Sequence, residues 1–444
     1  MQPSEFKNSW SHHCSFCETQ LLKSEDNGWC CLRGKHIVPR LPPYPAIVEE
    51  TFASHQAVLC SISRKLNNLF AFTILGVTGG FQSLPTPSNV AISGRVYHQI
   101  LDISQGNHSL RWFLYDEAGR NIRAVQQQVP QTLVACFREF LNRVNPYIHQ
   151  LRASFDPTNV QHLSIELHQP TSSGEVAAVI HGNNLHQVHP RNILIQQNGQ
   201  PAPQRIDILS PFYEPLQYPI LFPHGTLGWC PNSPMSQIRW YRSRILSESR
   251  FTKLGRLAGE YLVDMYSRVE DERLDYIRRA LHQQYSIRTQ YSSSHRNNNP
   301  VSFTGSNSSS SASYHEQHKS RGIVLPSSFL GSKAWAAGEV ADSLAICRSK
   351  GKPSFFITIT TNPNWPEIVE QLGPGQTASD IPLVVCRTFK ARMEAAIRAI
   401  KKFLGTVVYI VRVVEFQKRG LPHAHIVVKV FLFMTMIFIY RKSG

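Results

Sequence analysis

The segment Glu415-Phe-Gln-Lys-Arg-Gly-Leu-Pro-His423-Ala-His425-Ile-Val-Val carries the clearest structural pattern in the chain. Two histidines flank one small apolar residue at the start of an apolar run, directly after a basic turn that contains glycine and proline. In a β-strand, residues i and i+2 point to the same face. His423 and His425 would therefore present two imidazoles side by side, with Ala424 turned toward the core. Paired imidazoles on an open sheet face suit a divalent metal ion.

The residues around this segment predict a small α+β domain. Two apolar runs, 407–416 and 423–428, flank the basic turn and predict a β-hairpin. Upstream, 354–361 alternates as a sheet strand does, and 385–404 has apolar residues at helical spacing before a glycine that can end the helix. We therefore expect an antiparallel sheet with a helix within residues 317–428.

Across such a hairpin, Glu415 can face the histidine pair and supply an oxygen ligand. Two imidazoles and one carboxylate would leave open positions on Mg²⁺ or Mn²⁺ for a phosphate group, which the ion would polarise as a Lewis acid. The alternative is that His423 and His425 are ordinary strand residues without a ligand.

The charge balance favours a polyanionic partner. Lys and Arg number 46 against 30 Asp and Glu, which gives a formal net charge of +16 and a pI of about 9.6. Nucleic acid is the first candidate for a protein this basic, although basic tails and solubility can produce the same balance. At 444 residues, the chain is long enough for two or three domains.

Residues 1–45 form a cysteine- and histidine-rich head that predicts a zinc-ribbon-like fold. Cys14 and Cys17 make a Cys-x-x-Cys pair, and Cys30 and Cys31 follow about a dozen residues later. Adjacent cysteines are unusual as the second half of such a site, so one of them could be free while a nearby histidine completes it. The candidate histidines are His12, His13 and His36. The other possibility is that all four are plain reduced cysteines.

The remaining cysteines and the first residues indicate a reducing compartment. The chain has nine cysteines, an odd number, and five of them are scattered singly. The N-terminus lacks the apolar core of a signal peptide, so we expect no disulfide framework. The apolar run 430–440 is shorter than the about 20 residues that a membrane span needs, and we expect no membrane partner.

Composition divides the rest of the chain into further regions. Short apolar runs such as 69–75 predict strands, and 132–144 predicts an amphipathic helix. Tyr261 and Tyr266 lie five residues apart on a predicted helix, so their side chains diverge and core or interface roles are expected.

The full division is a head at 1–45, an α+β module with a Pro- and aromatic-rich connector at 46–235, a helical region at 236–289, a Ser/Asn-rich linker at 290–316, a partial sheet domain at 317–428 and an aberrant apolar tail at 429–444.

Two segments closely resemble motifs of the Helitron rolling-circle transposases. They are Phe356-Ile-Thr-Ile-Thr-Thr-Asn-Pro-Asn-Trp-Pro-Glu-Ile368 and the segment from Glu415 to His425. Supporting matches occur at 215–225, 261–274 and 321–332, and the cysteine head resembles the region that precedes this domain in the family. The resemblance covers most of the chain.

The resemblance implies a Rep-like core of the HUH endonuclease type, named for its His–hydrophobic–His motif and built on an antiparallel sheet. The family joins this transposon nuclease to a superfamily 1 DNA helicase and uses it in rolling-circle replication. For this chain, the resemblance implies binding of single-stranded DNA and metal-assisted nicking, in which a tyrosine attacks the phosphodiester. The implied metal ligands are His423, His425 and Glu415, and the implied DNA-binding residues are Thr358, Thr360, Asn362, Trp365, Lys418 and Arg419.

The chain also departs from the family pattern. Family members carry a tyrosine pair on a helix well beyond the histidines, whereas Tyr440 is the only tyrosine after them here. The sequence contains no Gly-x-x-x-x-Gly-Lys-Ser/Thr phosphate loop for ATP. We therefore expect a truncated Helitron-like protein that binds DNA and metal without completing strand transfer, located in the nucleus with its DNA. The alternatives are a nucleic-acid-binding module without catalysis and a non-functional pseudogene product that folds poorly.

Overall fold

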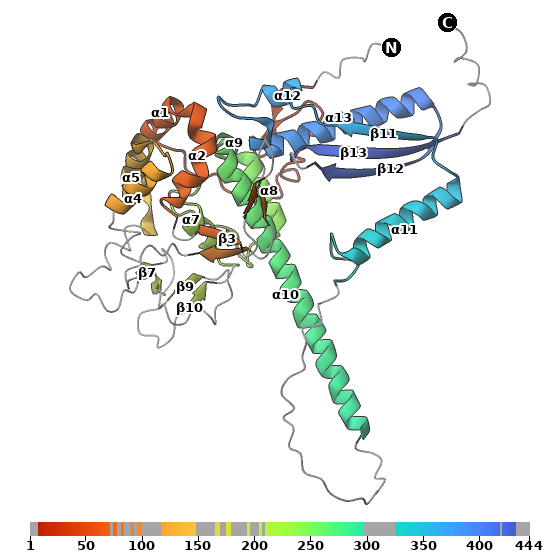
Figure 1. Ribbon diagram of the computed structural model, residues 1–444, viewed down its shortest axis with the longest axis horizontal. Coiled ribbons are helices and arrows are strands. Elements are labelled where there is room, and N and C mark those ends of the chain that lie inside the picture. Colours follow the sequence, from red (N-terminus) through yellow and green to blue (C-terminus); the bar gives the residue numbers. More distant parts are fainter. Residues whose placement is uncertain are drawn as a thin grey trace, which may run out of the picture. The chain divides into compact units, whose positions relative to one another are not determined.

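The structure, a computed structural model, describes residues 8–71, 74–77, 81–83, 90–92, 96–99, 117–147, 165–168, 175–178, 193–195, 204–206, 209–296, 325–417 and 420–431. It combines helices with small antiparallel sheets, and the α+β class predicted from the sequence is confirmed (Figure 1). Most of the predicted linker, Tyr440 with most of the predicted tail, and both Lys418 and Arg419 lie outside the described residues.

The chain divides into two compact units. The first comprises Met1–Arg268, Phe356–Thr406 and Arg412–Ile426. The second comprises Val269–Phe355, Val407–Val411 and Val427–Gly444. The cysteine head and the histidine motif both belong to the first unit.

The helices are α1 (Ala46–Ser54), α2 (Gln56–Asn68), α4 (Glu117–Gln126), α5 (Gln131–Val144), α7 (Tyr213–Gln217), α8 (Gln237–Ser247), α9 (Ser249–Lys253), α10 (Gly255–Arg296), α11 (Lys333–Lys350), α12 (Pro366–Val369), the 3₁₀ helix η2 (Ala378–Asp380) and α13 (Pro382–Leu404). The strands are β1 (His12–His13), β2 (Gln20–Leu21), β3 (Ile74–Val77), β4 (Phe81–Ser83), β5 (Val90–Ile92), β6 (Val96–Gln99), β7 (Ile165–His168), β8 (Glu175–Ala178), β9 (Ile193–Ile195), β10 (Gln204–Ile206), β11 (Phe355–Thr360), β12 (Val407–Phe416) and β13 (Pro422–Val430).

Strands β11, β13 and β12 form a three-stranded sheet in that order, with the histidine strand in the centre (Figure 1). This confirms the strand predicted over 354–361 and the predicted hairpin. Burial alternates along β13: Ala424 and Ile426 are fully buried, whereas His423 and His425 are half-buried on the opposite face. Gly420 in the turn has a φ of 74°, a backbone conformation that glycine adopts without a steric cost.

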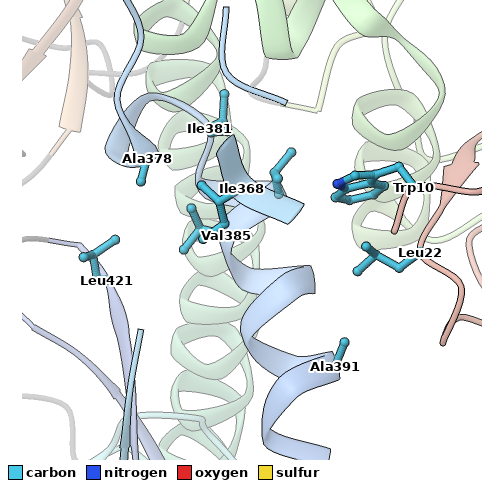
Figure 2. Packing of buried hydrophobic residues seen from close by; sticks show 9 residues of the cluster. Trp10, Leu22, Ile368, Ala378, Ile381, Val385, Ala391 and Leu421 are labelled. Atoms are coloured by element: carbon cyan, nitrogen blue, oxygen red, sulfur yellow. The ribbon is translucent and has the colours of Figure 1, made fainter. Parts of the chain in front are cut away.

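Helix α13 packs on the segments that flank this sheet, and its bounds confirm the predicted helix at 385–404. It starts with proline in its first turn, where the missing N–H costs nothing, and ends at Gly405 with φ at 71°. Its buried residue Val385 belongs to an apolar cluster with Ile368 and Leu421 (Figure 2). The helix therefore ties the turn before β13 to the segment that follows β11.

The cysteine head packs on the same helix. Trp10 and Leu22 of the head lie in the cluster around α13 (Figure 2), and the Trp10 indole N–H donates to the carbonyl of Glu367 over 2.7 Å. Arg387 of α13 makes an ion pair with Glu25 at 2.5 Å, and both side chains are about nine-tenths buried. The Arg387 guanidinium also lies 4.6 Å from the centre of the Trp10 ring. The head is thus held by apolar contacts and by a buried charge pair.

A second core holds helices α1 and α5 together. The rings of Phe52 and Phe137 lie 5.3 Å apart, and Tyr44 meets Phe52 edge-on at 5.4 Å. Such pairs add specific geometry to a large buried apolar area. The bounds of α5 confirm the helix predicted at 132–144. The strand predicted at 69–75 is wrong at its start, because Leu69 and Phe70 form the turn that ends α2 and are buried there.

Buried charges fix the beginning of α10. Glu214, Asp264 and Arg268 are all fully buried. The Glu214 carboxylate lies 3.6 Å from Arg268 and accepts a 2.7 Å hydrogen bond from the hydroxyl of Tyr261. Burial, together with the Glu214 carboxylate, raises the pKa of Tyr261 well above its usual value, so this hydroxyl stays neutral. The core role predicted for Tyr261 is confirmed, and Tyr266 is half exposed.

In the second unit, α10 continues to Arg296, into the range predicted as linker. Ser332 caps the start of helix α11, because its hydroxyl accepts a 2.9 Å hydrogen bond from the N–H of Trp335. None of the residues of α11 is buried. The hydroxyl of Tyr409 donates to the carbonyl of Gly351 over 2.8 Å. In the part of the chain that the structure describes, no helix combines the length and hydropathy needed to cross a membrane.

We expect Arg387→Ala to lower the free energy of unfolding by about 3–5 kcal/mol, because it leaves the buried carboxylate of Glu25 without its cation. Urea denaturation followed by tryptophan fluorescence measures this loss. Lys390→Ala on the same helix is the control, because its ion pair with Glu394 is largely exposed and should contribute less than about 1 kcal/mol. Equal effects of the two substitutions would show that the buried pair does not hold the head.

Candidate metal centre

The sheet brings Glu415, His423 and His425 together, as the sequence predicted. One ligand atom from each residue lies within 4.8 Å of the other two. The Nε2 atom of His425 lies 3.2 Å from Oε1 of Glu415, across the hairpin. The two imidazole rings have centres 4.6 Å apart and planes at 75°, so they converge instead of stacking. Strand β13 provides both nitrogens, and β12 provides the carboxylate.

Strand β11, which pairs with the edge of β13 opposite β12, contacts both histidines. The hydroxyl of Thr360 lies 2.9 Å from Nδ1 of His423, and the hydroxyl of Thr358 lies 3.4 Å from Nδ1 of His425. Both threonines are exposed on the face of the sheet that carries the imidazoles. The sequence assigned them to a DNA-binding groove, whereas the contacts that the structure shows for their hydroxyls are to the metal-ligand candidates.

Phe356 is a third contributor from β11, and the sequence reasoning missed its role. Its ring stacks on the His425 imidazole at 5.4 Å with an interplanar angle of 24°, and two-thirds of the residue is exposed. The alternation along the strand could have predicted its position. Phe356, Thr358 and Thr360 alternate with isoleucines and must share a face.

The other predicted DNA-binding residues lie beside this face or outside the described part. The side chain of Asn362 accepts a 2.9 Å hydrogen bond from the N–H of Asn364 and so closes the turn after β11. Trp365 is half-buried; the Arg392 guanidinium lies 4.6 Å from its ring centre, and the Phe389 ring stacks at 6.5 Å. Lys418 and Arg419 are not among the described residues.

The donor set fits a divalent cation with open coordination positions. Two imidazole nitrogens and one carboxylate oxygen form a mixed donor set that could hold a metal ion. The side chains of His425 and Glu415 are 34% and 55% exposed, so water or a phosphate oxygen can reach the remaining positions. With the proton on Nδ1 and directed to the threonine hydroxyls, the Nε2 lone pairs would be free to bind an ion.

The head holds a second cluster of metal-ligand candidates. Cys14, Cys17, Cys30 and Cys31 are all buried free thiols whose sulfur atoms lie within 4.8 Å of one another. Sγ of Cys14 is 3.7 Å from that of Cys31, and Sγ of Cys17 is 3.2 Å from that of Cys30. Four thiolates bound to one tetrahedral zinc ion, at Zn–S distances of about 2.3 Å, have sulfur–sulfur distances comparable to these. The cluster could hold a metal such as zinc.

The electrostatics of the head favour ionisation of Cys14 over that of Cys31. Burial opposes ionisation of Cys14, but the backbone N–H groups of Phe16 and Cys17 and the neighbouring thiols outweigh it and lower the pKa of Cys14 to about 7. Burial raises the pKa of Cys31 to about 11. A thiol that ionises near neutral pH provides a first anchor for a soft cation.

The histidine alternatives for the head are not part of the cluster. The ligand group at the head consists of the four cysteines alone among the described residues. His12 and His13 form strand β1, which pairs with β2 to support the first cysteine knuckle. Nε2 of His36 lies 3.0 Å from the guanidinium of Arg239.

Comparison with known proteins gives one family. Residues 236–428 match the family model described as "Helitron helicase-like domain at N-terminus". The matched range contains strand β11, helix α13 and the histidine hairpin, whereas the cysteine head precedes it. No curated protein and no solved structure gives a significant match to the chain.

We expect the purified chain to carry one zinc ion per head, and Cys30→Ser to remove it, because this substitution deletes one of four converging thiols. Native mass spectrometry measures the zinc content. A strong chelator should also lower the unfolding temperature, because structural zinc contributes folding free energy and the head packs on α13.

Cys230→Ser is the matched control, since Cys230 is a free cysteine outside the cluster. It should leave both the zinc content and the unfolding temperature unchanged. A wild-type chain that carries no zinc, and whose stability ignores the chelator, would contradict a metal-holding head.

Proposed function

We propose that the chain binds single-stranded DNA at a divalent-metal centre formed by Glu415, His423 and His425. The match of residues 236–428 to the Helitron helicase-like N-terminal domain supports a Helitron-related protein. The observation that carries the proposal is the convergence of these ligands on the open face of one sheet. On this proposal, the three residues would act as the metal-binding half of an HUH-type nicking centre.

The donor set and its exposure support a phosphate as the group bound at the ion. A divalent cation held there would act as a Lewis acid toward a phosphodiester oxygen. Mn²⁺ is the ion that we expect, with Mg²⁺ as the weaker alternative, because imidazole provides two of the three ligands. The proposed role of the chain is the binding of metal and DNA, without a nucleophilic step.

The charge of the chain supports a DNA partner. A net charge of +16 attracts a polyanion over long range and makes the affinity depend on salt. Next to the metal centre, Phe356 offers an exposed ring that a nucleobase can approach. With DNA as the partner, we propose the nucleus as the compartment of the protein.

The cysteine head favours a second candidate function. A four-thiol cluster packed on α13 fits a nucleic-acid-binding module in which the histidines hold no metal. Such a module would bind DNA through its basic surface alone, and its affinity would be the same with and without a divalent ion.

We expect the wild-type chain to bind Mn²⁺, and the double substitution His423→Ala/His425→Ala to remove this binding by deleting two of three ligands. Isothermal titration measures the metal. Fluorescence anisotropy with a labelled single-stranded oligonucleotide at low salt measures DNA binding in Mn²⁺ and in EDTA. The metal-dependent part of the DNA affinity should disappear in the double variant.

His12→Ala is the histidine control, because His12 lies outside both ligand clusters. It should change neither Mn²⁺ binding nor DNA binding. DNA affinity that is unchanged by EDTA and by the double substitution would favour the metal-independent module, and absence of DNA binding at low salt would contradict both functions.

A further inference from the structure

We propose that Thr358 and Thr360 are positioning residues of the metal centre, which hold the Nδ1 atoms of His425 and His423 so that both Nε2 atoms face the ion. This inference rests on the proposed metal-binding function and assigns a role to residues that would not touch the metal. It replaces direct DNA contact as the expected task of these threonines.

The pairing of β11 with β13 creates the arrangement. The N–H of Ser354 donates to the carbonyl of Val428, and that of Thr361 donates to the carbonyl of Pro422. The two strands therefore run antiparallel. Two threonines spaced by two residues consequently face two histidines with the same spacing, and each hydroxyl meets one imidazole.

A hydroxyl at Nδ1 decides which nitrogen of a neutral imidazole can bind a metal. When Nδ1–H donates to the threonine oxygen, the proton is fixed there and the Nε2 lone pair is free. Partners of this kind orient ligating histidines, and their loss typically weakens metal binding by about 10–100-fold. The 2.9 Å contact of Thr360 is a normal hydrogen bond, whereas the 3.4 Å contact of Thr358 is long, so Thr360 should matter more.

Phe356 adds a second restraint on one of the rings. Its side chain stacks on the His425 imidazole, while Nε2 of the same ring faces Glu415. A quarter turn of this imidazole about its Cβ–Cγ bond would break the stacking and both polar contacts at once. The stacking on Phe356 and the contact with Glu415 thus compensate for the weak threonine contact of His425. The orientation of His423, by contrast, depends on Thr360.

The test compares two substitutions at each threonine. Thr→Val keeps the shape and the β-branch and removes the hydroxyl, whereas Thr→Ser keeps the hydroxyl. We expect Thr360→Val to weaken Mn²⁺ binding by about 10–100-fold, whereas Thr360→Ser should keep the wild-type affinity. We expect Thr358→Val to have a smaller effect. Both positions are exposed, so neither valine should disturb the core, and circular dichroism checks the fold.

A spectroscopic measurement separates orientation from general damage. With Cu²⁺ as the probe ion, electron spin-echo envelope modulation detects the imidazole nitrogen remote from the metal and is sensitive to its hydrogen bond. Thr360→Val should change this signal, and Thr360→Ser should not. Ile359→Val, on the opposite face of the same strand, is the control and should leave affinity and spectrum unchanged.

The outcomes separate this inference from the function on which it rests. If the wild-type chain binds no Mn²⁺, both are overturned. If the wild-type chain binds Mn²⁺ and the double histidine variant does not, the metal centre stands. In that case, wild-type affinity and an unchanged remote-nitrogen signal in Thr360→Val would overturn the positioning role alone.

Discussion

The register of β13 against β11 is the constraint on which the candidate metal centre depends. Side chains along a strand alternate between faces, so a slip of one residue would turn both imidazoles toward the core and bring Ala424 and Ile426 to the surface. The observed register buries those two apolar residues completely. Hydrophobic burial therefore selects the pairing that also places the candidate metal ligands together on one face. The hydroxyl of Thr361, which donates to the carbonyl of Pro422 over 2.5 Å, reinforces it at the end where the histidines lie.

Helix α13 connects this sheet to the cysteine head. Its residue Arg387 lies between head residues, with Glu25 as its ion-pair partner and Trp10 under its guanidinium. A buried ion pair carries a large desolvation cost, so it specifies one arrangement more than it adds net stability. Apolar contacts of Trp10 and Leu22 supply the favourable burial. The two ligand clusters are thus parts of one folded unit, although they lie at opposite ends of the sequence.

Local patterns were sufficient to predict the elements around the histidines. Alternation predicted the strand at 354–361, and the basic turn between apolar runs predicted the hairpin and the approach of Glu415 to His425. The contacts of the head could not be predicted, because Glu25 and Arg387 are 362 residues apart and no periodicity links them. The threonine hydroxyls were assigned to DNA because a sequence shows which residues share a face and not which atoms meet across strands.

Glu415 differs from the histidines in a way that bears on how firmly an ion would be held. It lies on β12, at the edge of the three-stranded sheet, and more than half of its side chain is exposed. Ordering such a flexible carboxylate around an ion costs conformational entropy, of the order of 1 kcal/mol or more, whereas the restrained imidazoles lose little. The two imidazoles are therefore restrained before any ion binds, whereas Glu415, although it already contacts Nε2 of His425, would lose more freedom on binding one. If an ion binds here, such a centre would exchange its metal readily, and ligands would enter and leave on the carboxylate side.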